Sequence, residues 1–302
     1  MNERLDIIFA ILRQQLFMFL RLDVGVEHRS HILRLLNDKV TDGLLFLTTT
    51  HLLIVSIFSA RRLTKMDIQD FADQVKVPFS MCVASKRNTG KSVLLNQFVV
   101  RMVETKKIDV PIIFSNTTGL NDDYPDIPKH LKQPYNEEAL QRLIDHQKKI
   151  PKEKRKNILV VFDDVLGDKK ADRSSLILYC YAIGRHININ PILASQVSNR
   201  VLTPTVKANS DYILLSRLNR QHIVNIWEAI TNINRNDFIA FIEDVNKDYK
   251  FCVVDMTSQS NQPEQFLLLV KARPPKQVKK DETETENREP MVRLPEKISG
   301  AY

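Results

Sequence analysis

The sequence predicts an α/β fold in which a mostly parallel central sheet is flanked by helices. Short apolar runs with strand character alternate with helical patterns from about residue 77 to residue 270. Polar residues directly follow several of these runs, and ligands of parallel sheets bind at the carboxyl ends of the strands. The 302 residues are 43% hydrophobic and 26% charged, which is ordinary for a globular protein with one large domain.

The first apolar run, residues 77–84, leads into a candidate phosphate-binding loop. The loop matches the pattern at every fixed position except the first, where Ser85 replaces glycine. Serine is compatible with this position if its φ angle is negative. Residues 93–102 predict a helix whose N-terminal amides would face the phosphates. The candidate nucleotide-binding residues are Ser85, Lys86, Arg87, Asn88, Thr89, Gly90, Lys91 and Ser92.

Within this loop, Lys91 and Ser92 have separate chemical tasks. A lysine at this position reaches the β and γ phosphates, and the hydroxyl that follows it binds the magnesium ion. The alternative is a chance Gly-Lys-Ser sequence, which the preceding strand and the following helix make a poor explanation.

A second landmark is the buried strand at residues 158–164, which ends in two adjacent carboxylates. Asp163 would hold the magnesium ion, and Asp164 would orient or deprotonate the attacking water. The strand at residues 191–195 ends at Gln196, whose amide can bind the γ-phosphate or that water. The alternative is an Asp-rich turn with no catalytic role, which is common after a strand. The presence of Lys91 and Ser92 in the same chain argues against this alternative.

The remaining elements complete the alternation of strands and helices. Asn136 can cap the helix at residues 136–150. The basic run Lys148–Lys156 is either a solvated helix end and linker or a loop that touches DNA phosphates. We expect further strands at 110–115, 211–215, 251–255 and 266–270, and further helices at 171–185, 222–230 and 236–245.

The sequence predicts three regions. Residues 1–70 form an apolar or helical extension of open role, residues 71–272 form the nucleotide-binding domain, and residues 273–302 form a disordered charged tail. The apolar run at residues 43–58 is shorter than the roughly 20 residues that a membrane helix needs. A buried segment, a partner-binding surface, a membrane span and a translation start at Met66 remain alternatives. The N-terminus does not resemble a secretory signal.

The cysteine content and the net charge indicate which metal sites and partners to expect. The three cysteines have no metal-ligand spacing, so we expect reduced thiols and no zinc site. The formal net charge of +8 suggests a polyanionic partner, either nucleic acid or an anionic membrane.

The stretch from Gly184 to Gln196, which begins Gly-Arg-His, resembles the segment after the acidic strand in FtsK/HerA-type DNA translocases. Residues 206–213 continue the resemblance. With the loop and the Asp-Asp pair, it is closest to the genome-packaging ATPases of large double-stranded DNA viruses, virophages and polinton-like elements. It covers roughly residues 77–270. Asp164 departs from the pattern, because many translocases have glutamate there.

This resemblance implies a RecA-like P-loop NTPase that uses ATP and Mg²⁺ to drive double-stranded DNA through a homo-oligomeric ring into a capsid. It implies phosphate contacts without sequence reading, a capsid or portal-like partner, and a location in the host cytoplasm, at a viral assembly site or in the virion. Arg185 would be the finger that reaches a neighbour's nucleotide, with Arg200 and Arg217 as rivals. A small-molecule kinase, a protein with an inactive nucleotide site and a related translocase that does not package DNA are the alternatives.

Overall fold

The computed structural model describes residues 64–117, 123–165, 171, 174–196, 203–228, 235–245, 249–260 and 263–273. The apolar run at 43–58, Arg200 and the tail after residue 273 lie outside these ranges. The predicted boundaries of the three regions therefore stay predictions.

A nine-stranded sheet forms the centre of the described part of the chain, in the order β1-β9-β8-β7-β2-β6-β5-β3-β4. Every neighbouring pair is parallel except those of β8, which is antiparallel to β7 and β9. The strands are β1 (Thr64–Asp67), β2 (Met81–Ser85), β3 (Val110–Ser115), β4 (Lys132–Gln133), β5 (Ile158–Asp163), β6 (Ile189–Ser195), β7 (Tyr212–Ser216), β8 (Lys250–Asp255) and β9 (Leu267–Lys271).

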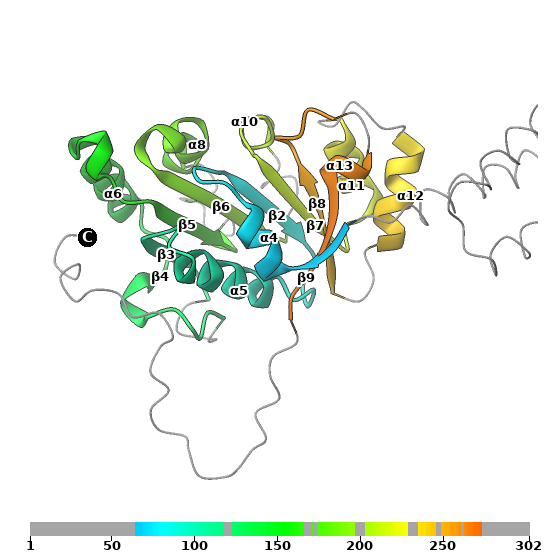
Figure 1. The fold of residues 1–302 in the computed structure, drawn as a ribbon, viewed down its shortest axis with the longest axis horizontal. Coiled ribbons are helices and arrows are strands. Elements are labelled where there is room, and N and C mark those ends of the chain that lie inside the picture. Colours follow the sequence, from blue (N-terminus) through cyan, green and yellow to red (C-terminus); the bar gives the residue numbers. More distant parts are fainter. Residues whose placement is uncertain are drawn as a thin grey trace, which may run out of the picture. The chain divides into compact units, whose positions relative to one another are not determined.

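Helices cover both faces of the sheet (Figure 1). One face carries α4 (Ile68–Gln74) and α5 (Lys91–Glu104). The other carries α6 (Glu137–Lys149), α8 (Ser175–Ile183), α10 (Pro204–Ala208), α11 (Arg220–Trp227) and α12 (Arg235–Val245). The shorter helices are η1 (Lys129–Leu131), η2 (Lys152–Lys154), η4 (Gly184–Ile187) and α13 (Pro263–Phe266).

Strand β5 shows why the central strands are apolar along their whole length. Val160 and Phe162 pack into the core under α6 and α8, whereas Leu159 and Val161 pack into the core under α4 and α5. Side chains alternate between the two faces of a strand, so a strand covered on both faces must be apolar throughout.

The predicted α/β fold with a mostly parallel sheet is confirmed, and each predicted strand and helix has a counterpart in the structure. Some bounds differ: β2 begins at Met81 rather than residue 77, and α8 ends at Ile183, where η4 takes over. β1, β4 and the short helices α4, α10 and α13 were not predicted from the sequence. β1 has the polar sequence Thr-Lys-Met-Asp, and β4 has only two residues, so neither has an apolar strand pattern.

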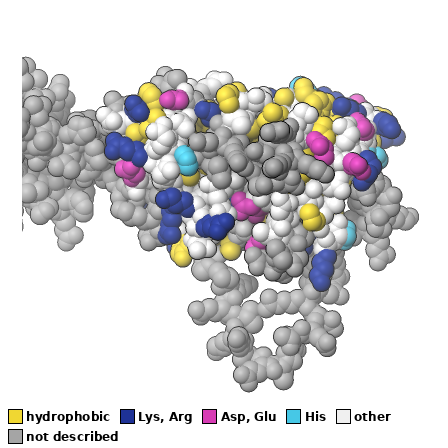
Figure 2. Space-filling model, turned by 180° about the vertical axis from the view of Figure 1, so that it is seen from behind, with side chains coloured by type: hydrophobic (Ala, Val, Ile, Leu, Met, Phe, Trp, Pro, Cys, Tyr) yellow, Lys and Arg dark blue, Asp and Glu magenta, His cyan; other side chains and the backbone are white. Residues whose placement is uncertain are grey.

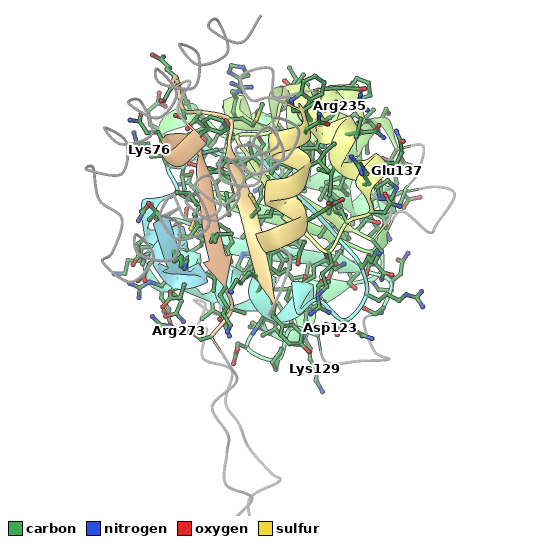
Figure 3. The ribbon with its side chains drawn as sticks, turned by 90° about the vertical axis from the view of Figure 1, so that its right-hand side faces the viewer. Lys76, Asp123, Lys129, Glu137, Arg235 and Arg273 are labelled. Carbon is green, nitrogen blue, oxygen red and sulfur yellow. The ribbon has the colours of Figure 1, made fainter. Side chains whose placement is uncertain are left out.

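The parallel strands end at one edge of the sheet, called here the carboxyl edge, and begin at the amino edge. Arg273 follows β9 at the carboxyl edge, and Lys76 precedes β2 at the amino edge. Figure 3 shows Asp123 and Lys129 on the same side as Arg273, with Lys76 on the opposite side. Because β8 runs the other way, its first residue, Lys250, lies at the carboxyl edge.

Candidate functional site

The candidate phosphate-binding loop lies at the carboxyl edge, between β2 and α5. Asn88 and Gly90 have left-handed backbones with φ angles of 57° and 81°, and Lys91 is the first helical residue. Within the loop, the Thr89 hydroxyl donates a hydrogen bond to the Lys86 carbonyl at 3.0 Å. The first amides of a helix have no partners within it, so the start of α5 offers donors to an anion at the loop.

Ser85, which stands at the first glycine position of the pattern, is the last residue of β2 and pairs with Ser216 of β7. Its backbone is therefore extended, a conformation that any residue adopts. The left-handed turns come later, at Asn88 and Gly90. Glycine is not needed at position 85, but the buried Ser85 hydroxyl has no hydrogen-bond partner among the described residues.

The start of α5 and the end of β5 meet at the loop. The Lys91 ammonium contacts Asp163 Oδ1 and lies 2.8 Å from Asp164 Oδ2. The Ser92 hydroxyl donates to Asp163 Oδ2 at 3.3 Å. β5 and β2 both flank β6, so strand order alone brings the end of β5 to the start of α5.

Asp163 is buried, and burial raises the pKa of its carboxyl because desolvation penalises the charged form. The Lys91 ammonium acts against this and lowers the same pKa. Tyr124, also buried, donates its hydroxyl to Asp163 Oδ2 at 2.8 Å. Lys91 and Tyr124 thus stabilise the negative charge of the buried Asp163 carboxylate, which burial alone would disfavour.

Gln196 and Arg87 extend the contacts of Asp164. The Gln196 amide donates to Asp164 Oδ2 at 3.0 Å, and its carbonyl oxygen accepts from Arg87 Nε at 2.7 Å. Asp164 has a left-handed backbone with φ 51°, and its amide donates to the Ala194 carbonyl of β6. Strained non-glycine backbones of this kind gather at functional sites.

Arg185 does not join this group. It lies in η4, before β6 begins, and is therefore at the amino edge, the opposite end of the strands from the loop. There it is exposed and lines a cavity of about 170 Å³ with Ser80, Tyr181 and Asp211 among others. Its rival Arg217 is at the carboxyl edge, directly after β7.

Two residues near the site, Tyr124 and Tyr249, were not predicted from the sequence. Tyr124 lies in the polar connection after β3, and Tyr249 precedes β8, so neither belongs to a motif. A Cβ atom placed on Gly90 would lie 3.6 Å from Tyr249 Cδ1, which puts this ring beside the loop. A tyrosine in a connecting loop carries no pattern that predicts such a contact.

Ser92 and Asp163 could hold a magnesium ion. Mg²⁺ takes oxygen ligands and is usually bound through one or two protein groups together with waters and substrate phosphates. The Ser92 hydroxyl and the Asp163 carboxylate fit that requirement, because their oxygens lie 3.3 Å apart. No group of three or more His, Cys, Asp or Glu side chains that could hold a metal occurs in the described ranges. The three cysteines are free and buried, and burial raises the pKa of Cys82 and Cys180 to about 12.

Residues 69–267 match the family described as poxvirus A32 protein. No curated protein sequence matches the chain. Among solved structures, the DNA-packaging ATPase B204 from Sulfolobus Turreted Icosahedral Virus is similar, with a TM-score of 0.47 and 16% identity over 65% of this chain and 98% of that chain.

Two further solved structures are similar to the chain. The genome packaging NTPase B204 from Sulfolobus turreted icosahedral virus 2, in complex with ATP-gammaS, has a TM-score of 0.42 and 19% identity over 60% of this chain and 94% of that chain. The pCW3 conjugation coupling protein TcpA has a TM-score of 0.46 and 15% identity over 64% of this chain and 60% of that chain. The family match spans the loop, both carboxylates and Gln196.

Proposed function

The chain belongs to the poxvirus A32 protein family, and we propose that it is an ATP-hydrolysing motor that moves double-stranded viral DNA into a capsid. The main support for ATP hydrolysis is that Lys91 contacts both Asp163 and Asp164 at the carboxyl edge. These are the cation and carboxylates that hydrolysis of a nucleoside triphosphate requires at a phosphate-binding loop.

Lys91 and the first amides of α5 bind the triphosphate in this proposal. The structure shows the Lys91 ammonium held by the two carboxylates. A triphosphate at the loop offers that ammonium a partner of higher negative charge. Binding would therefore draw Lys91 towards the β and γ phosphates and release Asp163 and Asp164 for their own tasks.

Ser92 and Asp163 would hold magnesium. Their oxygens lie 3.3 Å apart, so one cation can contact both. When bound, the ion neutralises charge that develops on the β and γ phosphate oxygens. Tyr124 fixes the direction of the Asp163 carboxylate by its hydrogen bond at 2.8 Å.

Asp164 would act on the attacking water. Its side chain is 26% exposed, compared with 3% for Asp163, so it is the carboxylate that water can reach. The Gln196 amide donates to Asp164 and is itself oriented by Arg87. Gln196 can therefore sense the terminal phosphate or the water while it keeps Asp164 in place.

We propose that Arg185 acts in a neighbouring subunit of a homo-oligomeric ring. Its place at the amino edge separates it from the loop of its own subunit, so it can reach a nucleotide only across an interface. An arginine supplied in this way stabilises charge on the transferred phosphoryl group. Mixing Lys91→Ala and Arg185→Ala subunits tests the idea: restored turnover is expected, and a mixture as inactive as each variant would refute it.

DNA is the proposed cargo, and contacts to its phosphates without sequence reading suit a packaging motor. No helix among the described residues is long and apolar enough to cross a membrane. A translocase of the same type that does not package DNA would share the nucleotide site. Binding to a capsid or portal-like protein would distinguish the packaging motor.

Magnesium-dependent ATP turnover by the purified chain tests the enzymatic part of the proposal. Lys91→Ala should reduce turnover to background, because the loop loses its phosphate-binding cation. Lys76→Ala is the matched control, since it removes an exposed lysine at the opposite edge of the sheet (Figure 3). Turnover by Lys91→Ala at the wild-type rate, with both variants folded, would refute the assignment.

A further inference from the structure

Apart from the loop residue Lys91, the groups of this chain that are expected to act on its own terminal phosphate lie on one side of β2. β6 and β5 follow β2 in the sheet, and they bring Gln196, Asp163 and Asp164 to the loop. The terminal phosphate must point to that side for these groups to reach it. The other end of the nucleotide, its ribose and base, must therefore leave the loop away from β5 and β6.

Two side chains occupy the opposite side of β2, where β7 and β8 lie. Ser85 pairs with Ser216, so Arg217 is placed beside the first residue after β2. The antiparallel β8 begins at the same edge, and Tyr249 immediately precedes it. The position of a Cβ atom on Gly90 is 3.6 Å from Tyr249 Cδ1, so the ring borders the loop.

Tyr249 presents an aromatic surface to solvent at this place. The residue is exposed, with a relative accessibility of 55%, whereas tyrosine is intermediate in burial among residue types. The Arg217 guanidinium carbon lies 5.2 Å from the ring centroid, within the range of a cation–π contact. Both residues have left-handed backbones, with φ angles of 56° for Tyr249 and 49° for Arg217. Such conformations are costly for bulky residues and cluster at functional sites.

We propose that Tyr249 stacks on the base of the bound nucleotide and that Arg217 is a positioning residue that holds the Tyr249 ring. The inference rests on the proposed function, because it concerns the same nucleotide site. Aromatic rings stack on any base, since every base has a π face. The site would therefore recognise a nucleotide through its base without strong selection among purines.

Binding of ADP and of inorganic tripolyphosphate to the full chain tests the proposal, because tripolyphosphate has phosphates but no base. Tyr249→Ala should weaken ADP binding by about 5- to 150-fold and leave tripolyphosphate binding unchanged. Tyr249→Phe is the matched control: it keeps the ring and should bind both ligands as the wild type does. Thermal unfolding verifies that each variant is folded.

An equal loss of both ligands in Tyr249→Ala would overturn the proposal, because it would mean that the ring only supports the loop. Unchanged ADP binding would overturn it as well. Arg217→Met should weaken ADP binding and spare tripolyphosphate, whereas loss of tripolyphosphate would assign Arg217 to a phosphate and refute its positioning role. Failure of the wild type to bind either ligand would instead refute the proposed function.

Discussion

Ser85 and Ser216 are neighbouring buried serines on β2 and β7, and their hydroxyls differ in one respect. Ser216 donates to the Lys250 carbonyl at 2.8 Å, whereas the Ser85 hydroxyl has no hydrogen-bond partner in the part of the chain that the structure describes. A buried polar group without a hydrogen bond costs about 1–3 kcal/mol. Serine at the first loop position is thus compatible with the extended backbone but energetically unfavourable.

Replacing Ser85 with alanine should therefore stabilise the protein. We expect Ser85→Ala to raise the free energy of unfolding by about 1 kcal/mol, because it removes an unsatisfied hydroxyl. Ser216→Ala, which removes a satisfied one, should lower it by a similar amount. Denaturant unfolding of both variants checks this pair. Destabilisation by Ser85→Ala would show that its hydroxyl has a partner in solution.

At the scale of elements, Tyr181 connects α8 to two central strands. Its buried hydroxyl donates to the Met81 carbonyl of β2 and accepts from the Leu193 amide of β6 at 2.9 Å. Burial raises the pKa of this phenol well above its usual value, so it stays protonated as a donor. One side chain thereby fixes the helix to the strand that leads into the phosphate loop.

Removing this buried hydroxyl should lower the free energy of unfolding more than removing the hydroxyl of the half-buried Tyr179. Tyr181→Phe leaves a buried amide and a buried carbonyl without their partner, and we expect the free energy of unfolding to fall by about 1–3 kcal/mol. Tyr179→Phe, at a half-buried position of the same helix, should change the free energy of unfolding by less than about 0.5 kcal/mol. Equal effects of the two substitutions would contradict the bridging role.

Local pattern predicted the central strands because both faces of each are covered, as for Val160 and Val161 of β5. It could not predict β1 and β4, which lack an apolar strand pattern and are strands only through their pairing with β9 and β3. The same division applies to the site. Lys91 and Ser92 are adjacent in a motif, whereas Tyr124 and Tyr249 reach the site only through tertiary packing.

At the scale of the whole molecule, charge and polarity are the features that bear on DNA. The formal net charge is +8, but on the face in Figure 2 the Lys and Arg side chains are interspersed with acidic groups. The basic run Lys148–Lys156 precedes β5 at the amino edge, with its lysines exposed. A solvated helix end and linker or a loop that touches DNA phosphates both remain open as interpretations of this run. Phosphate contacts would make DNA binding weaken steeply as salt increases.

ATP-driven movement along double-stranded DNA is the most direct test of the central claim. A third strand annealed to a long duplex reports such movement, because a translocating motor displaces it. We expect the full chain with ATP and Mg²⁺ to displace the third strand and Lys91→Ala to leave it bound. ATP turnover without displacement, at a salt concentration at which DNA is bound, would contradict the claim that this ATPase is a DNA-translocating motor.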